Sequence, residues 1–135
     1  MARPGEDDPL FRDAAFHRRR HNGTWEVVEA PVMAAAIADS HAHLQLLADP
    51  ALSLARAGMH NVEFVETIVD IWEDGDETFD GLQAWQVEAI QHALGMKQRA
   101  MCSAPRPSVP RVRIATGCHP HNAKHYDDAL EQRLR

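Results

Sequence analysis

Apolar and polar residues follow one another along this chain in short blocks, and three of the blocks have the pattern of strands. Residues 32–38 are apolar and bounded by other residue types, as in a short buried strand. Residues 61–71 alternate apolar with polar positions and are rich in β-branched side chains, and residues 111–116 have a similar character. We therefore predict three strands over these ranges.

Helix signals follow the first of these strands. Asp49 is placed to cap a helix that has Pro50 as its first residue, because proline fits the first helical position. Gly58 stands where this helix would end. The three prolines within residues 103–110 predict a loop before the third strand.

Two further helices are predicted downstream. Residues 72–79 form an acidic loop, after which Asp80 and Gln83 have the spacing of a capping box. The helix that begins there places one apolar face at Leu82, Trp85, Ala89, Ile90 and Ala93. Asn122 is expected to cap a last helix, in which apolar residues recur every four positions at Tyr126, Leu130 and Leu134.

The resulting order is strand, helix, strand, helix, strand, helix. Alternation of this kind is typical of an α/β fold with a parallel sheet of βαβ units. In such folds the segments that follow the strands carry the chemistry. Two histidine clusters of this chain fall directly after predicted strands, so the pattern places them at one rim of the sheet.

Residues 1–31 are expected to form an N-terminal extension to a domain that spans residues 32–135. The extension contains a basic run over residues 17–21, a turn signal at residues 22–23 and a short strand pattern over residues 25–28. We interpret it as a loosely attached segment. The alternative is a contact between its arginines and a phosphate or nucleic acid.

Composition limits the class of protein. The chain has 135 residues, 44% hydrophobic and 25% charged, which is typical of one globular domain. No apolar run approaches the roughly 20 residues that cross a bilayer, and the N-terminus lacks a signal-peptide pattern, so we expect a cytoplasmic protein without membrane contact. Cys102 and Cys118 are expected to be reduced thiols. The net charge of −6 argues against nucleic-acid binding through bulk charge.

The first histidine cluster has the spacing of a pair of metal ligands. His41 and His43 are two residues apart at a strand end, so both side chains point to the same side. Two imidazoles placed in this way can bind one metal ion. Asp39 shares their parity and could orient an imidazole or support the metal. A polar strand end without a metal is the alternative interpretation.

The second cluster, Gly117 to His121, follows the third predicted strand. Pro120 fixes the backbone between His119 and His121, and this rigid pair could bind a phosphate oxygen or supply a metal ligand. Lys124 is the nearest cation, and it either attracts a substrate phosphate or is a solvated lysine. A Cys118–His119 nucleophile pair is disfavoured, because adjacent residues of an extended chain point to opposite faces.

Both clusters resemble one family. The segment Asp39 to Leu44, D-S-H-A-H-L, resembles the opening D-[ST]-H-x-H-L signature of the TatD family of metal-dependent hydrolases. The segment Thr116 to His121, T-G-C-H-P-H, resembles the later G-x-H-P-H motif of that family. Their order, and the strand and helix between them, agree with the family from Ala34 to the C-terminus.

The resemblance implies a TIM-like (β/α)₈ barrel that hydrolyses phosphodiester bonds, in many members as a deoxyribonuclease on DNA. It implies a divalent metal ion (Mg²⁺, Mn²⁺ or Zn²⁺), with two ions in the complete enzyme, at the carboxyl ends of the strands. His41 and His43 would be metal ligands, and His119 and His121 would be catalytic residues. His119 would face the substrate phosphate, near which Lys124 is the closest cation by position alone, and metal-activated water would attack phosphorus.

The chain also departs from the family. A complete barrel takes about 250 residues, and only about three βα units are recognisable here. The later ligands of the family, a bridging Glu, two His and an Asp, have no match. We therefore expect the N-terminal part of a barrel, with an exposed sheet edge and an incomplete metal site, and little activity on its own.

Other functions stay open. Polymerase-and-histidinol-phosphatase-type phosphoesterases and amidohydrolases also begin with H-x-H at a first strand. The alternative outside the enzymes is a non-catalytic chain that binds a partner, or a second copy of itself, through the open sheet edge. A nucleic-acid-binding module that uses Arg18 to Arg20 is disfavoured by the acidic composition.

Overall fold

Three parallel strands form the main sheet of the protein. The computed structural model describes residues 14–135, and the part of the predicted extension over residues 1–13 lies outside them. The strands are β3 (Ile37–Ala42), β4 (Val62–Asp70) and β5 (Arg111–Gly117), in that spatial order. Both neighbouring pairs are parallel, so the predicted sheet of βαβ units is confirmed.

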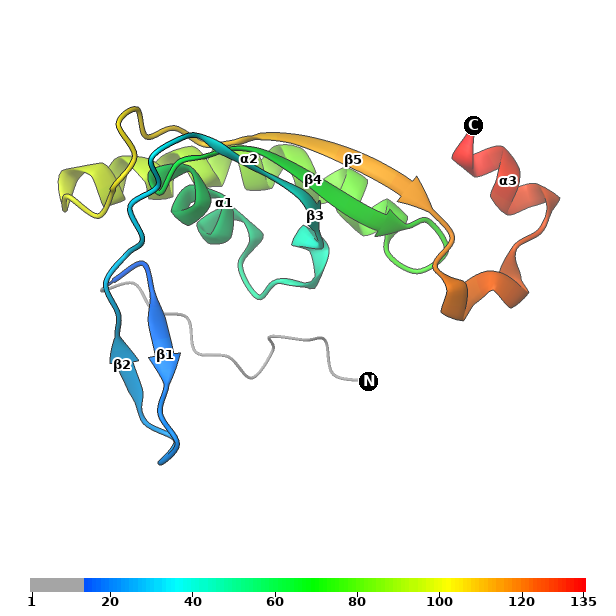
Figure 1. The fold of residues 1–135 in the computed structure, drawn as a ribbon. Helices are drawn as coiled ribbons and strands as arrows, with labels where there is room; N and C mark the ends of the chain where they lie inside the picture. The colour runs from blue at the N-terminus through cyan, green and yellow to red at the C-terminus, as the bar shows by residue number, and fades with distance from the viewer. Residues whose placement is uncertain (1–13) are drawn as a thin grey trace.

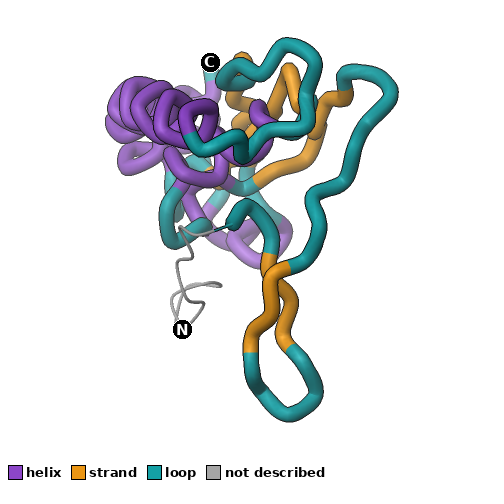
Figure 2. Tube along the Cα trace, turned by 90° about the vertical axis from the view of Figure 1, so that its left-hand side faces the viewer, coloured by secondary structure: helices purple, strands orange, loops and turns teal. Residues whose placement is uncertain are grey.

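Two helices cover one face of this sheet. Helix α1 (Pro50–Met59) connects β3 to β4, and helix α2 (Gly75–Gln98) connects β4 to β5. Figure 1 and Figure 2 show both helices on the same side of the strands. Alternate residues of β4 are buried against them, namely Val65, Thr67 and Val69. The opposite face of the sheet is more open, as expected for a sheet with helices on one side only.

The first predicted strand lies later in the sequence than expected. It is β3, which begins at Ile37 and includes Asp39 and His41. The pairing with β4 decides this boundary, because the parallel register starts where Ile37 meets Val62. The prediction of a buried strand was wrong: Ile37 is 39% exposed, since β3 is an edge strand with one open face.

The first helix begins as predicted, but its glycine has another role. The Asp49 carboxylate accepts a hydrogen bond from the Leu52 N–H at 2.8 Å, which caps the helix. The helix continues past Gly58 to Met59. A Cβ atom at Gly58 would lie 1.8 Å from the carbonyl oxygen of Ser108. The close approach of the loop before β5 therefore requires glycine here, and the helix ends one residue later than predicted.

Helix α2 begins earlier than the predicted capping box. Its cap residue is Asp74, and its first turn contains Asp76 and Glu77, which interact favourably with the positive end of the helix dipole. The prediction of a loop to residue 79 and a start at Asp80 was therefore wrong. The predicted apolar face is confirmed at the buried residues Ala89 and Ala93. It was wrong at Ile90, which is 50% exposed.

The C-terminal helix is also displaced. A 3-10 helix, η2 (Pro120–His125), occupies the expected start, and helix α3 (Asp128–Leu134) follows it. Asp127 caps α3 by accepting from the Leu130 N–H at 2.8 Å. The prediction that Asn122 caps this helix was wrong, because its side chain is held by carboxylates of the site described below.

Residues before the sheet form a hairpin that projects from the body (Figure 1). Strands β1 (His17–Arg19) and β2 (Trp25–Val27) pair in antiparallel fashion. Glu26 accepts hydrogen bonds from Arg18 and Arg20, both at 2.6 Å. These hydrogen bonds, first from Arg20 and then from Arg18, lower the pKa of Glu26. Two of the three consecutive arginines are therefore paired with a carboxylate, which leaves less positive charge for a phosphate.

None of the helices in the described part of the chain combines the length and apolar character of a membrane-spanning helix.

Candidate functional site

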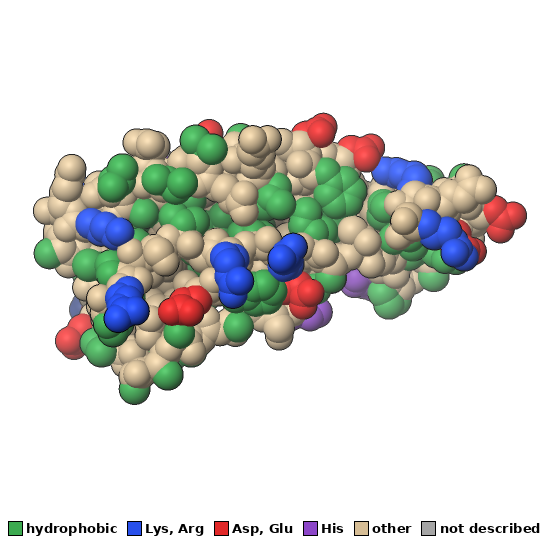
Figure 3. All heavy atoms as spheres, turned by 90° about the horizontal axis from the view of Figure 1, so that it is seen from above, with side chains coloured by type: hydrophobic (Ala, Val, Ile, Leu, Met, Phe, Trp, Pro, Cys, Tyr) green, Lys and Arg blue, Asp and Glu red, His purple; other side chains and the backbone are tan. Residues whose placement is uncertain are grey.

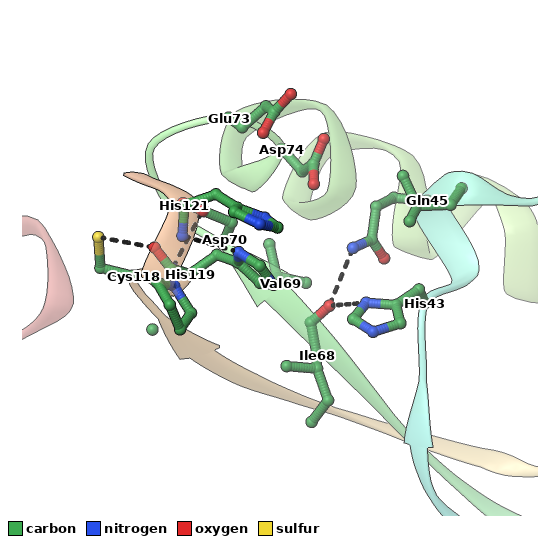
Figure 4. A pocket seen from close by; sticks show the side chains of 13 residues that line it. His43, Gln45, Ile68, Val69, Asp70, Glu73, Asp74, Cys118, His119 and His121 are labelled. Atoms are coloured by element: carbon green, nitrogen blue, oxygen red, sulfur yellow. Dashed lines mark hydrogen bonds between the residues drawn. The ribbon is translucent and has the colours of Figure 1, made fainter. Parts of the chain in front are cut away.

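A pocket of about 610 Å³ lies at the carboxyl end of the sheet (Figure 4). Its walls come from the segment after β3, the end of β4, the start of α2 and the segment after β5. The lining residues are His43, Gln45, Leu46, Ile68, Val69, Asp70, Glu73, Asp74, Gly117, Cys118, His119, Pro120 and His121. The parallel order of the strands brings the two histidine clusters to one rim, as the sequence predicts.

His43 is held in a defined tautomer. Its Nδ1 lies 2.9 Å from the carbonyl oxygen of Ile68. A carbonyl oxygen can only accept, so Nδ1 carries the proton and Nε2 keeps a free lone pair. A hydrogen bond of this kind from one ring nitrogen to a carbonyl is the usual support of a metal-binding imidazole.

A buried polar network stands behind His43. Gln45 donates from Nε2 to the same Ile68 carbonyl at 2.9 Å, and the Thr67 hydroxyl donates to Gln45 Oε1 at 3.1 Å. The Thr67 oxygen accepts in turn from the Leu44 N–H at 3.0 Å. Thr67 is fully buried and Gln45 is 7% exposed. Each of these polar groups has a partner, so the network fixes the backbone around His43 without an unsatisfied group.

His41 lies beside His43 at the strand end. The two ring centroids are 5.2 Å apart and the rings are nearly perpendicular. The predicted placement of both rings together is consistent with this geometry. Asp39 accepts a hydrogen bond from the backbone N–H of His41 at 3.0 Å, so it holds the main chain of His41 and makes no bond to an imidazole. His41 is exposed and does not line the pocket.

His119 has the opposite tautomer. It caps η2, and its Nδ1 accepts a hydrogen bond from the His121 N–H at 3.2 Å. The proton of the neutral ring is therefore on Nε2, which makes Nε2 a hydrogen-bond donor. The rings of His119 and His121 lie together, with centroids 4.7 Å apart. His43 is thus prepared to offer a lone pair, whereas His119 is prepared to donate a hydrogen bond.

Asp70 joins the end of β4 to η2. Its carboxylate accepts from the Asn122 amide at 2.7 Å and from the His119 N–H at 3.1 Å. Partial burial acts to raise the pKa of Asp70. The hydrogen bonds from Asn122 and from the N–H groups of Trp72, His119 and Glu73 outweigh it, so the pKa lies below the ordinary value. Asp70 therefore stays charged and holds the second histidine cluster at the rim.

Sequence reasoning missed these supporting residues. Asp70 ends a strand at the same rim as both histidine clusters, and that position could have identified it. Gln45 and Thr67 have no comparable signal, because their importance depends on a contact between residues 22 positions apart. Asn122 was predicted to cap a helix, but its side chain donates instead to Asp70 and, at 3.1 Å, to Glu73.

The two thiols are free, as predicted. Burial, and then the negative charge of Asp70, raise the pKa of Cys118. A raised pKa reduces the thiolate fraction, so a nucleophilic role of Cys118 is disfavoured. This agrees with the geometric argument against a Cys118–His119 pair.

The charge of the pocket is negative. Asp70, Glu73 and Asp74 line it, and its lining includes no lysine or arginine. Lys124 is exposed on η2 and lies outside this lining. An anionic substrate therefore needs an additional cation to enter the pocket favourably.

The histidines provide part of a metal site. The imidazole donors, and the free Nε2 of His43, fit a divalent transition metal. Among residues 14–135, no group of three or more His, Cys, Asp or Glu residues is arranged to hold a metal ion. A stable site usually has at least three protein ligands. His41 and His43 can thus contribute two ligands, and further donors are needed.

Comparison with known proteins gives no independent assignment, because no protein-family model, curated protein or solved structure matches the chain.

Proposed function

We propose that the pocket belongs to a divalent-metal-dependent hydrolase of phosphodiester bonds, similar to the TatD-type deoxyribonucleases. The observation that supports this function best is the pair of opposite tautomers at one rim. His43 presents a free Nε2 for a cation, and His119 presents an Nε2–H for an anionic oxygen. In this proposal the three strands are the N-terminal part of a (β/α)₈ barrel.

The proposal gives each histidine a role. His41 and His43 would hold the ion (Mg²⁺, Mn²⁺ or Zn²⁺), and Asp39 would support His41 through its backbone. A bound ion would supply positive charge for the phosphate and lower the pKa of a water molecule. His119 would donate to a phosphate oxygen, with His121 as its neighbour.

The acidic lining supports the need for such an ion. Because Asp70, Glu73 and Asp74 repel a phosphodiester, the substrate would bind only when the cation is present. Lys124 would add attraction from outside the pocket. We propose that the chain alone has little activity, because the described residues provide too few metal ligands. The cytoplasm, where free thiols stay reduced, is the proposed location.

Metal binding tests the first part of this function. We would titrate the purified chain with Mn²⁺ and Zn²⁺ by calorimetry and repeat the titration with His43→Ala. Binding that weakens by at least about tenfold in the variant is expected for a lost ligand. His21→Ala removes a histidine from the distant hairpin and is the matched control. Equal binding by the chain and both variants would contradict the proposed role of His43.

Hydrolysis tests the second part. The chain with bound metal would be assayed on DNA, on a chromogenic phosphodiester, on a phosphomonoester and on an amide. Weak cleavage of phosphodiesters alone supports the proposal. Preference for the phosphomonoester or the amide would favour the other H-x-H hydrolases named above. Cleavage of DNA at the rate of a complete enzyme would contradict the proposed incomplete site.

The exposed sheet edge supports a second candidate function. Within residues 14–135, β3 and β5 each pair with β4 on one side only, so each leaves one row of backbone groups without a strand partner there. A non-catalytic chain could bind a partner, or a second copy, by adding a strand there. A chain that binds no metal but associates through these strands would favour this function over hydrolysis.

A further inference from the structure

Helix α2 carries a stripe of exposed apolar side chains on one flank, part of which lies beside the loop that precedes β5. Phe79, Val87, Ile90 and Leu94 are each between 42% and 56% exposed. Figure 3 shows hydrophobic side chains gathered in a band along the molecule. Four large apolar side chains exposed on one helix form a patch of the kind that commonly marks an interaction site.

The stripe ends in opposite charges. Starting from Asp76, residues 79, 83, 87, 90 and 94 and finally Lys97 follow one another at steps of three or four positions, so all lie on one side of the helix. Asp76 is in the first turn of α2 and Lys97 is in the last turn. The stripe is therefore acidic at one end and basic at the other, and between them it is apolar except at Gln83.

Two copies of this stripe are complementary when the two helices run antiparallel. A two-fold rotation that sets a second α2 antiparallel to the first, with the axis beside Val87, places Asp76 against Lys97 of the other copy at both ends. The same rotation places Phe79 against Leu94 of the other copy. A symmetric pair uses the same patch on both chains, so each favourable contact occurs twice.

We propose that two copies of this chain form a dimer through antiparallel pairing of their α2 helices. The charge order selects the antiparallel arrangement, because a parallel one would place like charges together. Ile90, Leu94 and Lys97 also line a shallow hollow of about 300 Å³ with Ser108 and Val109. Phe79 of the second copy, which meets Leu94, is the side chain placed to enter this hollow. The dimer does not depend on the proposed hydrolase activity.

One contact within the chain competes only weakly with this pairing. Asp76 accepts a hydrogen bond from Arg133 at 2.8 Å, yet the Asp76 side chain remains 86% exposed. A carboxylate can accept from two cations, so Lys97 of the second copy can still reach it.

The mass of the full chain in solution, measured by sedimentation over a range of concentrations, tests the dimer. Wild-type protein is expected to change reversibly from monomer to dimer as its concentration rises. Leu94→Glu places a buried charge against Phe79 of the second copy and should raise the dissociation constant by at least about tenfold. Ala84→Glu adds the same charge on an exposed position outside the stripe and should leave the dissociation constant unchanged.

Charge reversal tests the antiparallel arrangement. Asp76→Lys and Lys97→Asp should each weaken the dimer, whereas the double variant should restore it, because opposite charges again meet at both ends. A chain that stays monomeric at every concentration would overturn the proposal. So would a dimer that is unaffected by Leu94→Glu, which would instead indicate association through the edges of β3 or β5.

Discussion

His43 and Gln45 donate hydrogen bonds to the same acceptor, the carbonyl oxygen of Ile68, each over 2.9 Å. The shared acceptor joins the segment after β3 to the end of β4. Because Thr67 holds the other end of the Gln45 amide, the orientation of the His43 ring depends on two buried residues that do not contact its free nitrogen. The proposed metal ligand is therefore positioned before any ion binds.

This network can be tested at Thr67. Thr67→Val removes the hydroxyl and leaves the Leu44 N–H and the Gln45 amide oxygen without their partner. We expect a loss of about 1–3 kcal/mol in the free energy of unfolding, measured with urea, because both groups stay buried. The ¹⁵N shifts of the His43 ring should also move toward a mixture of tautomers. Thr67→Ser keeps the hydroxyl and serves as the control. A Thr67→Val protein with unchanged stability and unchanged shifts would show that the network does not hold His43.

The phosphate-binding role proposed for His119 can be separated from its structural role as the cap of η2. His119→Asn keeps a side-chain acceptor for capping η2, since asparagine is a good cap residue, but it removes the Nε2–H. We expect an unfolding free energy within about 0.5 kcal/mol of the wild type. Binding of inorganic phosphate in the presence of Mn²⁺ should weaken by at least about tenfold, the loss expected for one hydrogen bond to a charged group. Unchanged phosphate affinity would exclude His119 as a phosphate donor.

The lowered pKa of Asp70 predicts that the stability of the chain depends on pH. Its pKa in the folded chain is lower than the ordinary value of 3.8, so its hydrogen bonds stabilise the fold above that pH. This contribution is lost as the pH falls through the lowered pKa. Asp70→Asn should therefore be less stable than the wild type at neutral pH, and the difference should narrow below about pH 4. Unfolding by urea at a series of pH values measures this, and a constant difference down to pH 2 would contradict it.

Substitution of two glycines by alanine is expected to change the stability of the chain in opposite directions. Gly58→Ala should destabilise the chain by about 1–3 kcal/mol, because its Cβ would collide with the Ser108 carbonyl. Gly95→Ala has no atom within 4 Å of the added Cβ and lies inside α2. It should stabilise the chain by up to about 1 kcal/mol through helix propensity. Thermal unfolding of the two variants compares them directly. Equal effects of the two substitutions would show that the loop before β5 does not approach α1 as closely as described.

The sequence by itself determined the elements whose signals are local. The alternation in β4 and β5, the Asp49 cap with Pro50, and the loop before β5 were all predicted, because each depends on neighbouring residues only. The two histidine clusters were predicted at one rim because strands that alternate with helices run parallel, so their carboxyl ends meet at one edge of the sheet. The barrel, the metal and the phosphodiester substrate stay predictions.

Only the tertiary structure decided what depends on distant contacts. The start of β3 is set by pairing with β4, and Asn122 serves Asp70, 52 residues earlier in the chain, and does not cap a helix. Ile90 has the spacing of a core residue, yet the packing of α2 leaves it exposed. The tautomer of His43 likewise depends on the Ile68 carbonyl, 25 residues further along the chain. Hydrogen bonds and packing across such separations appear only when the chain is folded, so no local pattern encodes them.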